Sequence, residues 1–220
     1  MSKKYLIVVE GKTDVVFLKD YLMHLNKSLS IITNLDKKDK KEIILKSEYI
    51  EIKILVAGGY TAIKEGNISQ TLRAHKDDGY TILLIQDADN PSKENGGAKN
   101  RIEYLKDIPY IDFNIFLFPN NEDDGDLETL LLRIKKNEKY DISHGCYQSY
   151  INCTKEINPK WSAELEEDKS LVFNYFRTYY GMENSKEENR RYETDYWDFD
   201  SHALLPLKGF FEETGIVKSN

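Results

Sequence analysis

The chain has 220 residues, 40% of them hydrophobic and 12% aromatic, which suits one large domain or a domain with an appendage and excludes a disordered chain. Its net charge of −7 excludes a global attraction to nucleic acid and leaves that role to a local basic patch or a bound metal ion. The short apolar run in MSKKYLIVVE does not fit a signal peptide, and no apolar segment approaches the ~18 residues of a membrane span. With only two cysteines and no C-x-x-C pair, we expect a reduced, cytoplasmic protein.

The beginning of the chain predicts a buried strand followed by a helix. Residues 5–9 are all apolar, as in a parallel strand covered on both faces, and apolar residues recur at helical spacing across 15–25. Residues 27–49 are polar, carry a lysine-rich run at 37–41, and predict an insertion that forms a hairpin or short helices. Further strands and helices then alternate, with strands at 50–57, 80–85 and 113–118 and helices near 60–76, 97–107 and 127–136.

This alternation predicts an α/β fold, with a mainly parallel four-stranded sheet flanked by helices over residues 1–138. Over residues 139–220 the pattern becomes helical, which predicts a helical C-terminal portion packed on the sheet domain. Its helices are expected at 143–156, 164–180 and 204–211.

Gly11-Lys12-Thr13 matches the end of a nucleotide-binding P-loop, but the rest of that motif is missing. The pattern needs a glycine five residues before Gly11, and Leu6 stands there inside the predicted strand. A strand backbone does not wrap around a phosphate, so we exclude the P-loop. What remains is Glu10 at the end of a buried strand.

Glu10, Asp87 and Asp89 all lie at the predicted carboxyl ends of parallel strands, where ligands of such sheets bind. Carboxylates gathered there repel one another, and a divalent cation offsets that repulsion. The Asp87-x-Asp89 spacing suits Mg²⁺, since strand alternation turns both side chains toward one side. A metal bound there can place a phosphate and activate a water molecule.

Two motifs together resemble the Toprim domain of topoisomerases, bacterial primases, some RNA-maturation nucleases and overcoming-lysogenization-defect nucleases. They are VVEGKTD at 8–14 and LIQDAD at 84–89, and Gly58-Gly59 fits a glycine turn seen in many of these proteins. DADN and the later FPNNEDDGDLETLL resemble, more narrowly, a stand-alone and poorly characterised Toprim-like family of prokaryotes.

The resemblance covers roughly residues 1–135 and implies roles for particular residues. Glu10 is the implied acid/base or metal ligand, and Asp87 and Asp89 are the implied ligands of Mg²⁺, with Mn²⁺ as the alternative ion. Gly11 is implied to let the backbone turn away from Glu10. Lys12 is a candidate catalytic contact to a phosphate, with a solvated loop lysine as the alternative.

Other polar residues have a structural and a functional interpretation. Asp126 and Glu128 are possible second-metal or outer-shell groups, although acids also favour the start of the helix that follows them. An EF-hand reading of that loop fails, because Leu131 stands where the bidentate glutamate belongs. Asp14 is predicted to be a helix N-cap in preference to a ligand.

In the C-terminal portion, Cys146 and Cys153 are predicted to be small buried residues of a helix. Several aromatic residues lie near three arginines in this portion. We expect them to pack in the core or at an interface in preference to stacking on the bases of single-stranded nucleic acid. They are Tyr175, Tyr179, Tyr180, Tyr192, Tyr196 and Trp197. Lys169, Lys208 and the run 37–41 are candidate contacts to phosphates.

The leading hypothesis is a Mg²⁺-dependent phosphoryl-transfer or phosphodiester-cleaving protein that acts on nucleic acid. The alternative is a non-catalytic module that binds nucleic acid or protein. The C-terminal portion is a possible surface for homo-oligomerisation or for a protein partner. A haloacid-dehalogenase-type phosphatase with Asp87 as nucleophile ranks third, because its Asp-x-Asp normally lies close to the chain start and Glu10 has no role in it.

Overall fold

A computed structural model describes residues 2–33, 42–64, 66–108, 112–136, 140–160, 167–183 and 190–218, so the lysine run at 37–41 lies outside the described residues. The strands are β1 (Lys3–Val9), β2 (Ser30–Thr33), β3 (Glu42–Lys46), β4 (Ile50–Val56), β5 (Thr81–Asp87) and β6 (Asn114–Phe118). The α-helices are α1 (Lys12–Leu25), α2 (Gly66–Asp77), α3 (Ala98–Lys106), α4 (Leu127–Arg133), α5 (Tyr140–Ile157), α7 (Glu167–Tyr180) and α8 (Leu205–Glu213). Short 3-10 helices are η1 (Tyr60–Ile63) and η3 (His202–Leu204).

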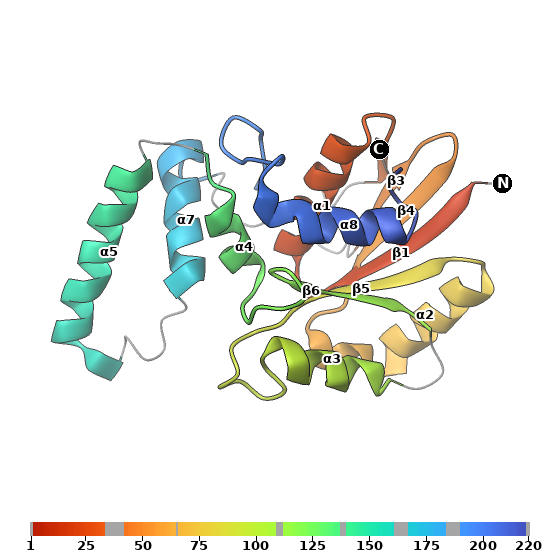
Figure 1. Cartoon of the computed structure of the whole chain (residues 1–220), viewed down its shortest axis with the longest axis horizontal. Helices are drawn as coiled ribbons and strands as arrows, with labels where there is room; N and C mark the ends of the chain where they lie inside the picture. Colours follow the sequence, from red (N-terminus) through yellow and green to blue (C-terminus); the bar gives the residue numbers. More distant parts are fainter. Residues whose placement is uncertain are drawn as a thin grey trace.

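The strands form one sheet in the order β2-β3-β4-β1-β5-β6 (Figure 1). The pairs β4–β1, β1–β5 and β5–β6 are parallel, which confirms the predicted α/β fold with a mainly parallel sheet. The sheet has six strands where four were predicted, because the insertion at 27–49 forms the antiparallel strands β2 and β3 and pairs β3 with β4. The helix predicted near 60–76 begins as the 3-10 turn η1 and continues as α2.

The chain reverses its direction of travel across the sheet between β1 and β5. From β1 the chain moves through α1 and the hairpin to β4 on one side, and it then crosses through α2 to β5 on the other side. In open α/β sheets, the carboxyl ends of the two strands at such a switch point frame the binding crevice. The carboxyl ends of β1 and β5 therefore frame the expected binding crevice.

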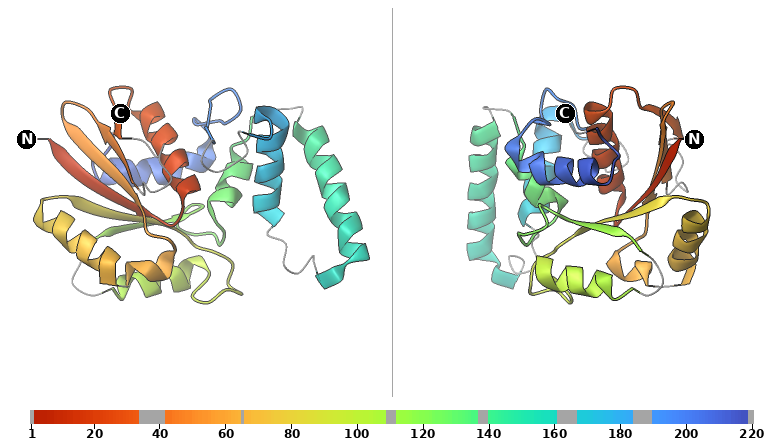
Figure 2. Two further views of the ribbon diagram at one scale, coloured as in Figure 1. Left: turned by 180° about the vertical axis from the view of Figure 1, so that it is seen from behind. Right: turned by 45° about the vertical axis from the view of Figure 1, so that its right-hand side comes forward.

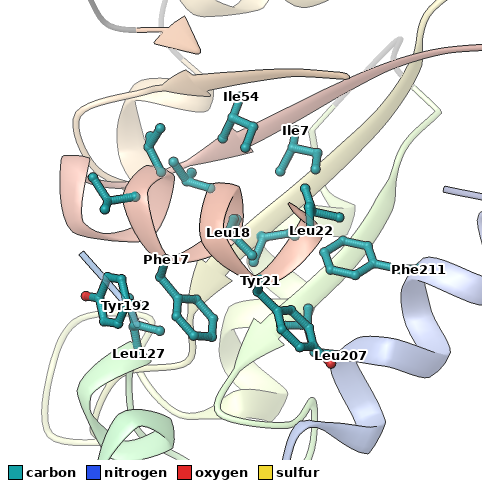
Figure 3. Packing of buried hydrophobic residues seen from close by; sticks show 14 of the residues in the cluster. Ile7, Phe17, Leu18, Tyr21, Leu22, Ile54, Leu127, Tyr192, Leu207 and Phe211 are labelled. Carbon is teal, nitrogen blue, oxygen red and sulfur yellow. The ribbon is translucent and has the colours of Figure 1, made fainter. Parts of the chain in front are cut away.

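The side chains of β1 alternate between two hydrophobic clusters, so the strand is buried on both faces as predicted. Ile7 and Val9 pack on the face covered by α1 and α8, and Leu6 and Val8 pack on the face covered by α2 and α3 (Figure 1). Figure 3 shows the first of these faces, where residues of α1 and α8 meet Ile7 of the sheet. Burial of all-apolar strands on both faces makes the sheet a firm base for residues at its edge.

The C-terminal portion adds to the same hydrophobic core and then extends away from the sheet. Val172 and Phe176 of α7 and Phe210 and Phe211 of α8 belong to the cluster that contains Ile7 of β1. Helix α7 packs on α4, and α5 packs on α7 at the outer end of the molecule (Figures 1 and 2). No helix in the described ranges is both long and apolar enough to cross a membrane.

Three of the aromatic residues expected to pack in the core do so, which confirms that interpretation for them. Tyr175, Tyr192 and Trp197 are each at most 3% exposed and contact one another or Phe176. The prediction that Cys146 and Cys153 are buried was wrong, since both thiols are exposed on α5. Both cysteines lie on the side of α5 that the described residues leave exposed. The helical spacing of small and apolar residues in α5 was therefore not a sign that these two are buried.

Candidate functional site

Glu10 follows β1 directly, Asp87 is the last residue of β5, and the two residues are in contact. The backbone N–H of Asp87 donates a hydrogen bond to Oε1 of Glu10, with 3.2 Å between nitrogen and oxygen. This contact arises because β1 and β5 are parallel neighbours, so their carboxyl ends reach the same edge of the sheet. Burial raises the pKa of Glu10, and the nearby Arg101 guanidinium works in the opposite direction.

Asp14 lies in the first turn of α1 and joins this group. The N-cap of α1 is Gly11, and Asp14 at the third helical position accepts a hydrogen bond from the Gly11 N–H at 2.9 Å. The prediction that Asp14 is itself the N-cap was therefore wrong, although the side chain does serve the cap. Burial, followed by repulsion from Glu128 and Glu10, raises the pKa of Asp14 to about 7.

The carboxylate of Asp87 points to the start of α4. Leu127 is the first residue of that helix, and its backbone N–H donates a hydrogen bond of 3.0 Å to Oδ1 of Asp87. A helix N-terminus favours negative charge, and this contact is part of what holds Asp87 in place. The pKa of Asp87 nevertheless lies well above its ordinary value, because of burial and of repulsion from Asp14 and Glu10.

Asp126 and Glu128, at the start of α4, complete the group of carboxylates. Both raise the pKa of Asp87 by repulsion, so both lie near it. Asp126 is the N-cap of α4 and accepts from the Thr129 N–H at 2.9 Å, which confirms that acids of this loop serve the following helix. Glu128 is 9% exposed, and burial followed by repulsion from Asp126 raises its pKa to about 7. We call Glu10, Asp14, Asp87, Asp126 and Glu128 the acidic cluster.

Asp89 differs from the other candidate ligands, because both of its carboxylate oxygens pair with cations. Oδ1 lies 2.8 Å from the ammonium of Lys93, and Oδ2 accepts from the guanidinium of Arg101. Strand β5 ends at Asp87, and Asp89 has a left-handed backbone with φ of 62° and bridges to Gly125. The alternation expected to turn Asp87 and Asp89 to one side therefore stops at Asp87.

Arg101 of α3 is a fully buried cation beside the acidic cluster. Its guanidinium carbon lies 3.4 Å from the centre of the Tyr60 ring, and its charge lowers the pKa of Glu10. Its Nε and Nη1 atoms have no hydrogen-bond partner within the described part of the chain. Tyr60 follows Gly58-Gly59, and both glycines have a positive φ, of 88° and 114°.

The remaining predicted site residues fall at three places. Lys12 is the first residue of α1 and half-buried, next to Glu10 in the chain. Gly11 has an extended backbone with φ of −132°, which any residue adopts, so the turn after Glu10 does not depend on glycine. Lys169 of α7 lies near enough to the cluster to lower the pKa of Glu10 and of Glu128, whereas Lys208 lines a pocket with Lys3.

Sequence reasoning missed Asp14 and Arg101 as members of the site. Asp14 had a usable signal, because the fourth residue after a strand-terminal glutamate lies in the first turn of the next helix and faces the same edge. Arg101 had no such signal, since its position depends on contacts with Asp89 and Tyr60 that are distant in sequence.

The cluster brings more negative than positive charge to the sheet edge. Among the described residues, Arg101, Lys169 and Arg190 are cations that lower pKa values in it, and Arg101 is already paired with Asp89. Among the residues that the structure describes, no three Asp, Glu, His or Cys side chains are arranged to hold a metal ion. An ion held here would keep several of its waters, as Mg²⁺ does, or draw the carboxylates together.

Fold and site together define an α/β protein with an acidic cluster at the switch point of a mainly parallel sheet. The chain belongs to the DUF3226 family, described as a protein family of unknown function, whose model matches residues 4–215. Among solved structures it is similar to the crystal structure of hypothetical protein PH0156 from Pyrococcus horikoshii OT3, at 15% identity and a TM-score of 0.45. That similarity covers 97% of this chain and 96% of the other. A search of curated proteins finds no match.

Proposed function

We propose that the acidic cluster binds Mg²⁺ or Mn²⁺ and that the protein is a metal-dependent, Toprim-type phosphodiesterase that acts on nucleic acid. The observation that carries the proposal is the placement of five carboxylates at the switch point, with pKa values raised in Glu10, Asp14, Asp87 and Glu128. Ionising carboxylates that are buried together costs free energy, because they are desolvated and repel one another. A divalent cation is the simplest group that offsets this cost.

Asp87 is the central proposed ligand, because each of the other four carboxylates raises its pKa. Glu10 is its hydrogen-bonded neighbour and the proposed acid/base, and Asp14 adds a third carboxylate from α1. Glu128 and Asp126 are proposed as outer-shell groups or ligands of a second ion. Asp89 would bind a metal directly only after it releases Lys93 or Arg101, so we assign it a supporting position.

A bound ion would supply charge stabilisation at a phosphate and a more acidic water molecule. The chain's own residues would then position the substrate. Lys169 of α7 lies near the cluster and Lys12 begins α1, so both lie where an ammonium group can contact a phosphate. The Toprim assignment is supported by a glutamate after the first parallel strand that contacts the last residue of the neighbouring parallel strand.

The test is a nuclease assay on single- and double-stranded DNA and RNA with Mg²⁺, Mn²⁺ or a chelator. Wild type is compared with Glu10→Gln and Asp87→Asn, and Glu122→Gln is the matched control, because it removes an exposed charge from the same acidic loop. We expect metal-dependent cleavage by wild type and the control, and a loss of at least a hundredfold in the two site variants. Equal cleavage by all four proteins, or cleavage in the chelator, would contradict the proposal.

One observation favours a second candidate, a non-catalytic module that binds nucleic acid or protein through this edge. Asp89, which the motif comparison implies to be a metal ligand, is neutralised by Arg101 and Lys93 instead. Metal binding that Asp87→Asn abolishes, together with no cleavage of any substrate by wild type, would support the binding module over the enzyme.

A further inference from the structure

Within the described part of the chain, the neighbours of helix α5 lie on one of its sides. Its inner side packs on α7, where Ile151 is fully buried and Lys155 pairs with Glu167 at 2.8 Å. Its outer side is exposed at the end of the molecule farthest from the sheet (Figures 1 and 2). Three large apolar side chains stand on that outer side, Ile142 at 75%, Tyr150 at 57% and Ile157 at 81% exposure.

These residues belong to one uncharged stripe along the helix. At ~100° per residue, all its members fall within an arc of about 100° that faces away from Ile151. The stripe consists of Ile142, Cys146, Ser149, Tyr150, Cys153 and Ile157. In a chain with 31% charged residues, an exposed helix face without a charge indicates an interface. Ser149 fits such a face, because its hydroxyl donates to the Gly145 carbonyl at 2.8 Å and needs no outside partner.

The isoleucines and the cysteines of the stripe mirror each other about its centre, where Ser149 and Tyr150 stand. Isoleucine stands at 142 and 157 and cysteine at 146 and 153, all symmetric about the point between Ser149 and Tyr150. A two-fold interface requires residue i to contact residue j while j contacts i. Two copies of α5 that pair antiparallel about that point satisfy this, and each isoleucine then meets an isoleucine, each cysteine a cysteine, and Ser149 meets Tyr150.

We propose that the outer face of α5 is a homodimer interface in which two copies of the chain pair their α5 helices antiparallel. The charged residue nearest the stripe is compatible with this pairing, since Glu156 would meet Ser143 of the second copy and not another acid. The antiparallel arrangement also places the N-terminal end of each helix dipole beside the C-terminal end of the other. This proposal does not depend on the function proposed above.

The length of α5 sets the strength expected of the dimer. Its 18 residues span about 27 Å, and a pair of such helices buries on the order of 1,000 Å² in total. That area lies just below the ~1,200 Å² at which standard stable interfaces begin. We therefore expect a dimer that forms and dissociates with protein concentration in the micromolar range.

The two native cysteines report the pairing directly. Facing positions of helices packed at ~8–10 Å bring Cα atoms within the ~4.4–6.8 Å that a disulfide needs. Cys146 of one copy would face Cys153 of the other, while the two copies of Cys153 would lie about 10 Å apart along the helix axis. Both thiols are free and exposed, so a mild oxidant such as copper phenanthroline in air will join them if the helices pair as proposed.

The test compares wild type, Cys146→Ser, Cys153→Ser and a mixture of the two variants, one with a size tag, on non-reducing gels after oxidation. We expect a disulfide-linked dimer for wild type, at least tenfold less for each variant alone, and a linked heterodimer in the mixture. Efficient linkage in either single variant would show parallel or random contact and overturn the antiparallel pairing. No linkage in the mixture would also overturn it.

Sedimentation without oxidant gives an independent answer. Wild type is expected to shift from monomer to dimer between about 1 and 100 μM. Ile142→Glu and Ile157→Glu should remain monomeric with an unchanged circular dichroism spectrum. The control Ile32→Glu, at an isoleucine exposed to 60% on β2, should dimerise as wild type does. Wild type that stays monomeric up to 100 μM would overturn the proposal and leave the face to a different protein partner.

Discussion

Removing one negative charge from the acidic cluster should stabilise the metal-free protein, and Glu128→Gln is the best variant with which to measure this. Glu128 is 9% exposed, and its pKa is raised from the ordinary 4.5 to about 7, mainly by burial and then by Asp126. This increase in pKa means that ionisation of Glu128 lowers the free energy of unfolding by roughly 3 kcal/mol. Glutamine keeps the size of the side chain and removes the charge.

The pH dependence of this effect has a definite sign. The pKa of Glu128 is higher in the folded than in the unfolded protein, so ionisation disfavours the folded state. The penalty is absent below pH ~4.5, grows as the pH rises toward 7, and is complete above the folded-state pKa. In a chelator, the unfolding free energy of Glu128→Gln should exceed that of wild type by up to ~3 kcal/mol at pH 8 and by only about 0.8 kcal/mol at pH 5.

Thermal unfolding followed by circular dichroism measures this difference. For a chain of this size, ~3 kcal/mol corresponds to an increase in Tm of roughly 6–12 °C. The control Glu122→Gln, an exposed acid of the same loop, should match wild type at both pH values. With Mg²⁺ at a hundredfold excess over its Kd, wild type should gain about 2.7 kcal/mol and the variant clearly less. A variant less stable than wild type in chelator at pH 8 would refute the reasoning, because Glu128 would then already be compensated by Lys169 and Arg190.

Two further predictions concern the packing around the site. Arg101→Met should cost about 3–5 kcal/mol in urea unfolding, because it leaves Asp89 without its buried partner. The double variant with Asp89→Asn should cost less than the sum of the single variants, and strict additivity would show that the pair does not couple. Phe17→Ala should cost about 3–5 kcal/mol, because Phe17 is fully buried between Phe118 and Tyr192. A cost under ~1 kcal/mol would contradict the packing of α1 on the sheet.

The sheet was predictable because its strands are short apolar runs that the fold buries on both faces. Periodicity placed β1, β4, β5 and β6 to within a few residues. Periodicity did not decide the secondary structure of the insertion at 27–49, because short apolar runs between polar residues fit a hairpin and short helices equally well. The exposed side of α5 was not predictable either, since periodicity shows that a helix has two faces and not which of them is covered.

The site was predictable where topology alone decides it. Glu10 and Asp87 meet because the carboxyl ends of neighbouring parallel strands share an edge. Asp89 departed from expectation because one left-handed residue ends the strand alternation, and its pairing with Arg101 depends on the position of α3. The sequence predicted Asp14 as a helix N-cap in preference to a ligand. In the structure its buried side chain both accepts the Gly11 N–H at the start of α1 and lies beside the other acids of the cluster.

Binding of Mn²⁺, followed by electron paramagnetic resonance, tests whether the acidic cluster is a divalent-cation site. Wild type and Glu122→Gln should remove free Mn²⁺ from solution with equal affinity, and excess Mg²⁺ should release it. The Asp87→Asn variant should bind Mn²⁺ at least tenfold more weakly. It removes the carboxylate whose pKa is raised by each of the other four acids of the cluster. Equal Mn²⁺ binding by wild type and Asp87→Asn, or no binding by wild type, would contradict the account.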